Sequence, residues 1–147
     1  MRHTIKTLSL LWNYLNIYYL KPFDAINDTL TANLLLSFKW PVNYTEIGSG
    51  DGAFSYVMHG GSFPISYDRY IDIDLNKTDI FDAHNMNFNF KLKSINKPRI
   101  DNAIDSKINH IKKIKSIGYA ENILRANFEN LPFLDNTIGN IFFYTPH

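Results

Sequence analysis

The sequence of 147 residues contains no cysteine. Disulfide bonds, thiolate metal sites and cysteine nucleophiles are therefore excluded, and the composition suits a reducing compartment. Histidine is scarce as well, and the five histidines show neither the HxH nor the HxxxH spacing typical of metal sites. We therefore expect a cytoplasmic protein that holds no metal.

The sequence also lacks an excess of one charge, since 15 basic residues stand against 14 acidic ones. This balance gives no electrostatic reason to expect nucleic-acid binding. An apolar run of about 18 residues, which a transmembrane helix needs, is lacking too. The nearest run, Leu8–Leu20, is interrupted by polar residues and has no small-residue cleavage site of a signal peptide. With 45% hydrophobic residues, the chain is expected to fold around a genuine core.

Residues 1–41 are predicted to form a helical segment. Apolar residues recur at intervals of three and four in Thr4–Leu20 and again in Phe23–Phe38, which predicts two helices. Pro22 suits the first turn of the second helix, and the residue before Pro41 avoids the helical region. The first helix could lie on a membrane surface, but it has few basic residues, so packing on the core or on a partner is favoured.

Residues 42–147 are predicted to form an α/β domain. Val42–Gly52 reads as a strand ending in a glycine turn, and a short helix follows until Gly60-Gly61. Further strands are predicted at Ile100–Asp105, Asn122–Ala126 and Ile138–Tyr144, with a helix at Lys107–Ile117. In that helix Ile108, Ile111 and Ile114 share one face, and Lys112, Lys113 and Lys115 lie elsewhere.

This alternation predicts a Rossmann-like fold, with a mostly parallel sheet and helices on both faces. Right-handed crossovers place the second and third strands on one side of the first strand and the fourth on the other. Residues 62–98 interrupt the pattern and are interpreted as an insertion. Within them, Tyr70–Asp74 alternates like a strand and Thr78–Ala83 could form a helical turn.

Two classes of cofactor fit the glycine turn. Gly48–Ala53 matches the dinucleotide pattern GxGxxG/A, and Asp72 and Asp74 lie about twenty residues further on, where an acid would bind the ribose. Glu46 argues against this class, because a carboxylate facing the turn would repel a pyrophosphate but suit an ammonium group. A second β–α–β step requires an acid at the end of its strand, and Asp105, rather than Asp72 or Asp74, occupies that position. The turn alone leaves both classes open.

Three linked motifs resemble those of class I S-adenosylmethionine-dependent methyltransferases. They are Glu46–Gly52, with glycine at alternate positions, Asp105 at a strand end, and Ala126–Asn136, which reads ANFENLPFLDN. The resemblance implies that Glu46 and the glycine turn hold the methionine end of the cofactor and that Asp105 accepts hydrogen bonds from the ribose. Asn127 and the Phe128 backbone would meet the adenine. The full set of implied cofactor-binding residues is Glu46, Gly48, Ser49, Gly50, Asp51, Gly52, Asp105, Ser106, Asn127 and Phe128.

The resemblance implies methyl transfer to a small molecule or a cell-surface sugar precursor. The family's sheet has more strands than the four found here, so the domain is interpreted as truncated after the fourth strand, with weak cofactor binding and little turnover. That strand would leave Ile141–Tyr144 as an apolar edge where a partner chain or a second copy could add. No catalytic residue is assigned; His147, which follows the fourth strand, is only a remote candidate for a general base. The alternatives are an NAD(P)-binding module and an inactive remnant or interaction module.

Overall fold

The computed structural model describes residues 2–38, 44–65, 67, 73–79, 83 and 100–143. Most of the predicted insertion, including Asp72, and the C-terminal residues 144–147 lie outside the described residues. The elements in chain order are α1 (Arg2–Leu15), α2 (Pro22–Ser37), β1 (Tyr44–Ile47), α3 (Ala53–Met58), β2 (Ile100–Asp105), α5 (Ile108–Ile117), β3 (Ala120–Arg125) and β4 (Asn140–Phe143).

The four strands form one parallel sheet in the order β3-β2-β1-β4. The predicted α/β Rossmann-like fold and the predicted strand order are therefore confirmed. In register, Glu46 on β1 lies between Ala103 on β2 and Phe142 on β4. The chain leaves β1 toward β2 on one side and returns to β4 on the other. The carboxyl end of β1 is consequently a topological switch point, where ligands bind in open α/β sheets.

Several element boundaries differ from those predicted. α1 ends at Leu15 rather than Leu20, because the chain turns there and the side-chain amide of Asn16 donates to the carbonyl of Phe63, 3.0 Å away. The turn buries Ile17 and Tyr18 in the core. β3 begins at Ala120, two residues earlier than predicted and two residues after Gly118, whose left-handed conformation ends α5.

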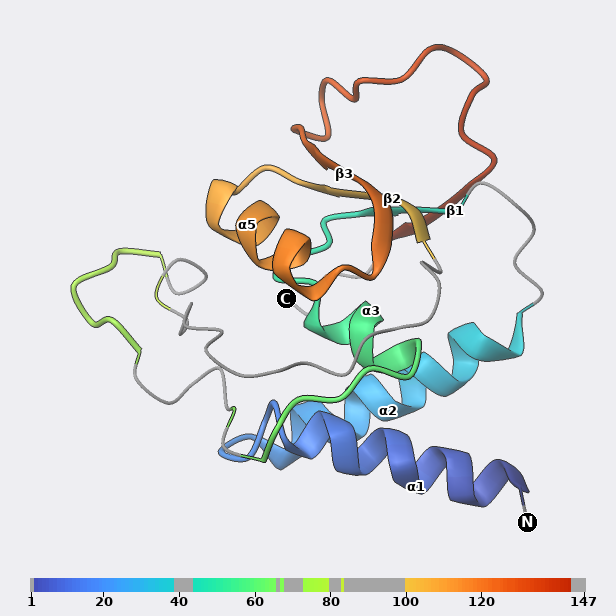
Figure 1. Cartoon of the computed structure of the whole chain (residues 1–147), viewed down its shortest axis with the longest axis vertical. Coiled ribbons are helices and arrows are strands. Elements are labelled where there is room, and N and C mark those ends of the chain that lie inside the picture. Colours follow the sequence, from blue (N-terminus) through green and yellow to red (C-terminus); the bar gives the residue numbers. More distant parts are fainter. Residues whose placement is uncertain are drawn as a thin grey trace.

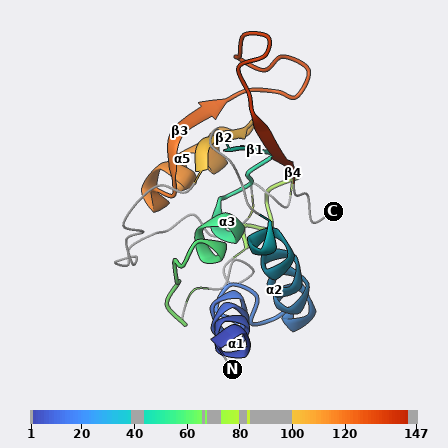
Figure 2. The same cartoon turned by 90° about the vertical axis from the view of Figure 1, so that its right-hand side faces the viewer.

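The described helices lie on one side of the sheet (Figures 1 and 2). α5 packs on β2 and β3, and α1 and α2 form a further layer beyond α3. On the opposite side, the loop that joins β3 to β4 rises above the strands (Figure 2). The second predicted layer of helices is thus not among the described elements.

Aromatic side chains join the helical layer to the sheet. The Tyr14 ring of α1 stacks on Phe54 of α3, with ring centroids 5.7 Å apart, and the Tyr14 hydroxyl donates to the Phe54 carbonyl. Phe54 in turn contacts Phe142 of β4, which contacts Tyr44 of β1. This continuous contact fixes α3, and with it the glycine turn before α3, against the sheet.

None of the described helices is both long and apolar enough to cross a membrane. β4 forms one edge of the sheet, as predicted, and its Ile141 and Phe143 are more than half exposed while Phe142 is buried. Addition of a partner chain or a second copy at this edge stays a prediction.

Candidate functional site

The glycine turn between β1 and α3 is held by the neighbouring strand β2. The backbone amides of Gly48 and Ser49 both donate to the carbonyl of Ile104, at 2.9 and 3.0 Å. The Ser49 hydroxyl accepts from the Ile104 amide at 3.1 Å. The turn is therefore a fixed structure at the carboxyl edge of the sheet, because its backbone groups are bonded to β2.

Gly52 is required by both its conformation and its surroundings. Its φ of 79° lies in the left-handed region, and a Cβ at this position would come within 2.4 Å of the Tyr119 ring. A clash at that distance requires the backbone or the buried ring to move. The last glycine of the turn thus allows Tyr119, just before β3, to pack directly beneath the start of α3.

Glu46 lies beneath the turn and is 3% exposed. Its Oε1 accepts from the Ser55 hydroxyl at 2.6 Å and its Oε2 accepts from the Tyr119 hydroxyl at 2.7 Å. The pKa of Glu46 is raised to about 7, chiefly by burial and in a smaller part by the nearby Asp105 and Asp51, while the two hydroxyl bonds oppose the rise. Burial also raises the pKa of Tyr119, so its hydroxyl stays a donor. Both carboxyl oxygens of Glu46 are thus already bonded inside the protein. The implied contact between Glu46 and a ligand ammonium group stays a prediction.

Asp105, at the end of β2, braces the turn from the other side. Its Oδ2 accepts from the Gly50 amide at 2.8 Å, and its Oδ1 accepts from the Lys107 amide at 2.8 Å. The His110 Nδ1 also lies 3.1 Å from Oδ1. A carboxylate offers about four acceptor sites. One site on Oδ2 therefore remains for a ligand hydroxyl, whereas the resemblance implied bonds to two ribose hydroxyls.

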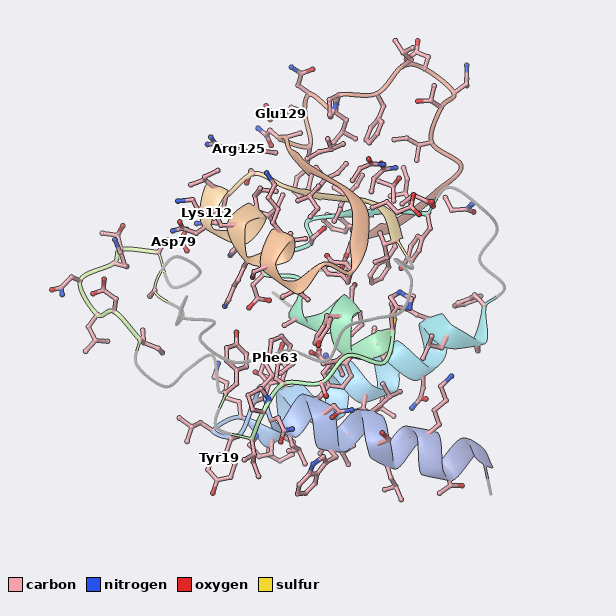
Figure 3. The ribbon with its side chains drawn as sticks, in the orientation of Figure 1. Tyr19, Phe63, Asp79, Lys112, Arg125 and Glu129 are labelled. Atoms are coloured by element: carbon pink, nitrogen blue, oxygen red, sulfur yellow. The ribbon has the colours of Figure 1, made fainter. Side chains whose placement is uncertain are left out.

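Asp51 forms a buried ion pair with Lys113 of α5. The Lys113 Nζ lies 3.1 Å from Asp51 Oδ2, and Lys113 is only 1% exposed. Asp51 Oδ1 accepts from the Ala53 amide at 3.1 Å and so caps α3. Lys113 was expected away from the isoleucine face, and the structure buries it in the ion pair with Asp51, whereas Lys112 lies on the outer side of α5 (Figure 3).

Asn127 and Phe128 follow β3 and are exposed. The Phe128 ring meets Phe143 of β4 edge to face, with centroids 5.4 Å apart. A Cβ added at Gly48 would lie 3.5 Å from both rings, which places the aromatic pair directly over the first glycine. An exposed aromatic surface thus adjoins the glycine turn at the switch point.

The structure brings most of the implied residues to one edge of the sheet. The sheet is parallel, so the carboxyl ends of its strands share one edge. The glycine turn follows β1 there, Asp105 ends β2, and Asn127 lies just beyond β3. Ser106 is exposed there, and its carbonyl accepts from the Arg125 Nε at 3.0 Å. Asp74 instead bonds the backbone and side chain of Asn76 within residues 73–79.

Four further residues of this region were missed by sequence reasoning: Ser55, His110, Lys113 and Tyr119. His110 and Lys113 are three residues apart on α5, and each meets a carboxylate of the turn region. A histidine and a lysine on one helix, together with two acids that stand at strand ends, could have indicated these two pairs. Ser55 and Tyr119 carried none, because their bonds to Glu46 depend on how α3 and β3 pack.

Three carboxylates, of Glu46, Asp51 and Asp105, lie near one another at the turn. Among the described residues of this region, Lys113 is paired with Asp51 and Lys107 with Asp79. In the part of the chain that the structure describes, no group of acids and histidines could hold a metal ion.

Comparisons with models of protein families, with curated proteins and with solved structures found no match.

Proposed function

We propose that this chain binds S-adenosylmethionine at the carboxyl edge of its sheet and is the cofactor-binding part of a methyltransferase. The acceptor would be a small molecule or a cell-surface sugar precursor. One observation carries the proposal: three carboxylates, of Glu46, Asp51 and Asp105, surround a glycine turn at the topological switch point.

The charge of the turn region selects between the two cofactor classes. A dinucleotide would bring a doubly charged pyrophosphate to the glycine turn, where the Asp105 carboxylate, which accepts from the Gly50 amide, repels it. S-adenosylmethionine brings a sulfonium and an ammonium group, which the same carboxylate attracts. Lys113 and Lys107 are held in ion pairs, so neither is poised as a phosphate ligand.

The fit of the cofactor to individual residues is consistent with this choice. The remaining acceptor site of Asp105 suits one ribose hydroxyl. The amide of Asn127 offers an acceptor to the adenine amino group, and the exposed Phe128 ring offers an apolar surface next to it. Asp74, which the dinucleotide alternative would use, lies outside the β-strands and bonds Asn76.

The chemistry asked of the protein is mainly alignment. The sulfonium of the cofactor is already an activated methyl donor, and holding donor and acceptor in line supplies roughly 7–11 kcal/mol of the barrier. No described residue is assigned a proton-transfer role.

Calorimetric titration with S-adenosylhomocysteine and, separately, NADH tests the proposal. We expect heat of binding for S-adenosylhomocysteine and none for NADH. Asp105→Asn should weaken binding about 10- to 100-fold, because a charge-assisted hydrogen bond contributes roughly 1.5–3 kcal/mol. Asp74→Asn is the matched control and should bind like the unmodified chain.

Thermal melts of both variants separate a loss of binding from a loss of folding. Tighter binding of NADH, or an equal loss of affinity in Asp74→Asn, would contradict the proposal.

A further inference from the structure

Helix α2 turns four large apolar side chains to solvent. Phe23, Ile26, Leu30 and Leu34, here named the α2 stripe, are between 44% and 82% exposed. The fully buried residues of the helix are small or polar, Ala25, Asp28, Thr29 and Ala32, while Leu35 and Leu36 pack partly buried against the core. An amphipathic helix normally buries its apolar face. The α2 stripe is therefore an apolar surface that the described part of the chain leaves exposed to a partner.

The neighbouring helix enlarges the surface. On α1, Leu8 and Trp12 are 60% and 61% exposed, one helical turn apart. Figure 1 shows α1 and α2 side by side at the end of the molecule remote from the sheet. Tyr19, in the turn that joins them, points away from the rest of the protein (Figure 3). The candidate cofactor site lies at the far side, so a partner on these helices would leave it accessible.

The exposed area matches a protein interface. A whole aromatic side chain buries roughly 200 Å², and Leu or Ile somewhat less. The exposed fractions of the α2 stripe together with Leu8 and Trp12 then amount to about 700 Å² per chain. A standard interface buries about 800 Å² per partner, whereas a contiguous apolar patch on a monomer seldom exceeds a few hundred Å².

The charge of α2 favours a protein partner over a membrane. Interfacial helices are rich in lysine and arginine on their polar face. Within Pro22–Ser37 there is no basic residue, and the only acids are Asp24 and the buried Asp28. A surface with few charges and several aromatic and aliphatic side chains is typical of the core of a protein–protein interface.

The spacing of the stripe suits a second copy of the same helix. Ile26, Leu30 and Leu34 follow one another at intervals of four, so they form a straight ridge of the kind that interlocks with another such ridge at about −50°. A two-fold axis across α2 would bring the same ridge from both copies together, and the ridge itself carries no charge.

We propose that the chain forms a symmetric dimer through the α2 stripe, with Leu8 and Trp12 of α1 at its margin. This inference is independent of the proposed cofactor.

Sedimentation equilibrium of the full chain tests the dimer. We expect a dimer at micromolar concentration, and a monomer for the double variant Leu30→Lys/Leu34→Lys, because two lysines per copy would meet their counterparts. Leu75→Lys is the matched control, since Leu75 is 90% exposed but lies outside α2, and it should remain dimeric. Circular dichroism melts verify that all the variants are folded.

The absence of cysteine allows a second measurement that leaves the apolar surface nearly intact. Leu30→Cys should be cross-linked to a covalent dimer by a short bismaleimide, whereas Leu75→Cys should form no covalent dimer under the same treatment. A chain that is monomeric at 100-fold higher concentration would overturn the proposal. So would a dimer that survives the double lysine change, or a monomer that instead floats with phosphatidylcholine–phosphatidylserine vesicles.

Discussion

Glu46→Gln tests whether the buried carboxylate beneath the glycine turn holds a proton near neutral pH. Burial is the main cause that raises the pKa of Glu46 from its ordinary value of 4.5 to about 7. Below pH 4.5 the Glu46 carboxyl is protonated in both the folded and the unfolded state. The contribution of Glu46 to the stability of the fold is then greatest. Between pH 4.5 and 7 the folded state keeps a proton that the unfolded state has lost, so the stability falls as the pH rises.

The size of this effect follows from the difference between the two pKa values. Each pKa unit corresponds to 1.36 kcal/mol, so ionising Glu46 in the folded chain costs about 3 kcal/mol once the pH exceeds 7. Glutamine resembles the protonated acid and can keep bonds to Ser55 and Tyr119. We therefore compare the unfolding free energy of Glu46→Gln with that of the unmodified chain. The difference should grow by about 3 kcal/mol in favour of the variant as the pH rises from 4.5 to 8.

Urea unfolding followed by circular dichroism at several pH values between 4.5 and 8 measures this difference. Glu129→Gln is the matched control, because Glu129 is exposed on the loop beyond β3 (Figure 3). The control removes a carboxylate of the same kind without touching the buried cluster. If the stability profile of Glu46→Gln ran parallel to that of the unmodified chain across this range, the assignment of a buried proton to Glu46 would be refuted.

Two further substitutions test the interior of the turn. Gly52→Ala should lower the unfolding free energy by about 2–5 kcal/mol, because a left-handed residue with a Cβ is strained and the methyl group would clash with Tyr119. Gly118→Ala has a similar φ but open space around it and should lose only about 1–2 kcal/mol, so equal losses in urea unfolding would exclude the clash. Lys113→Met should cost about 3–5 kcal/mol, because it leaves the Asp51 carboxylate buried without its cation. Adding Asp51→Asn should restore part of that loss, and a single-variant loss below about 1 kcal/mol would show that the ion pair is not needed.

The arrangement of the sheet could be predicted because it depends on patterns local to the chain. The chain runs in succession through a strand, a glycine turn, a helix and the strand that ends at Asp105. Because crossovers between parallel strands are right-handed, this succession allows few topologies. The strand order and the meeting of the glycine turn with Asp105 and Asn127 at one edge follow from that topology alone.

The interior of the site could not be predicted, because it depends on contacts between distant parts of the chain. The spacing in α5 sets Lys113 apart from the isoleucines but does not reveal that it is buried against Asp51. Asp105 was expected to serve the ligand, but it also braces Gly50. These partners are 62 and 55 residues apart in the sequence.

Periodicity has a related limit at the N-terminal helices. The spacing of Phe23, Ile26, Leu30 and Leu34 predicts a helix with an apolar face, and α2 is that helix. The same spacing does not reveal whether the face meets the chain's own core or another molecule. In the structure Ala25 and Ala32 face inward, and the larger side chains remain exposed.

Selective labelling of glycine with ¹⁵N provides the most direct test of the cofactor site. The chain has only seven glycines, so the spectrum is simple to assign, and three of them, Gly48, Gly50 and Gly52, form the turn. Titration with S-adenosylhomocysteine should shift the amide signals of these three, while Gly60 and Gly61, beyond the far end of α3, should stay in place. Unchanged signals from the turn at saturating ligand, or shifts confined to Gly60 and Gly61, would contradict binding at the carboxyl edge of the sheet.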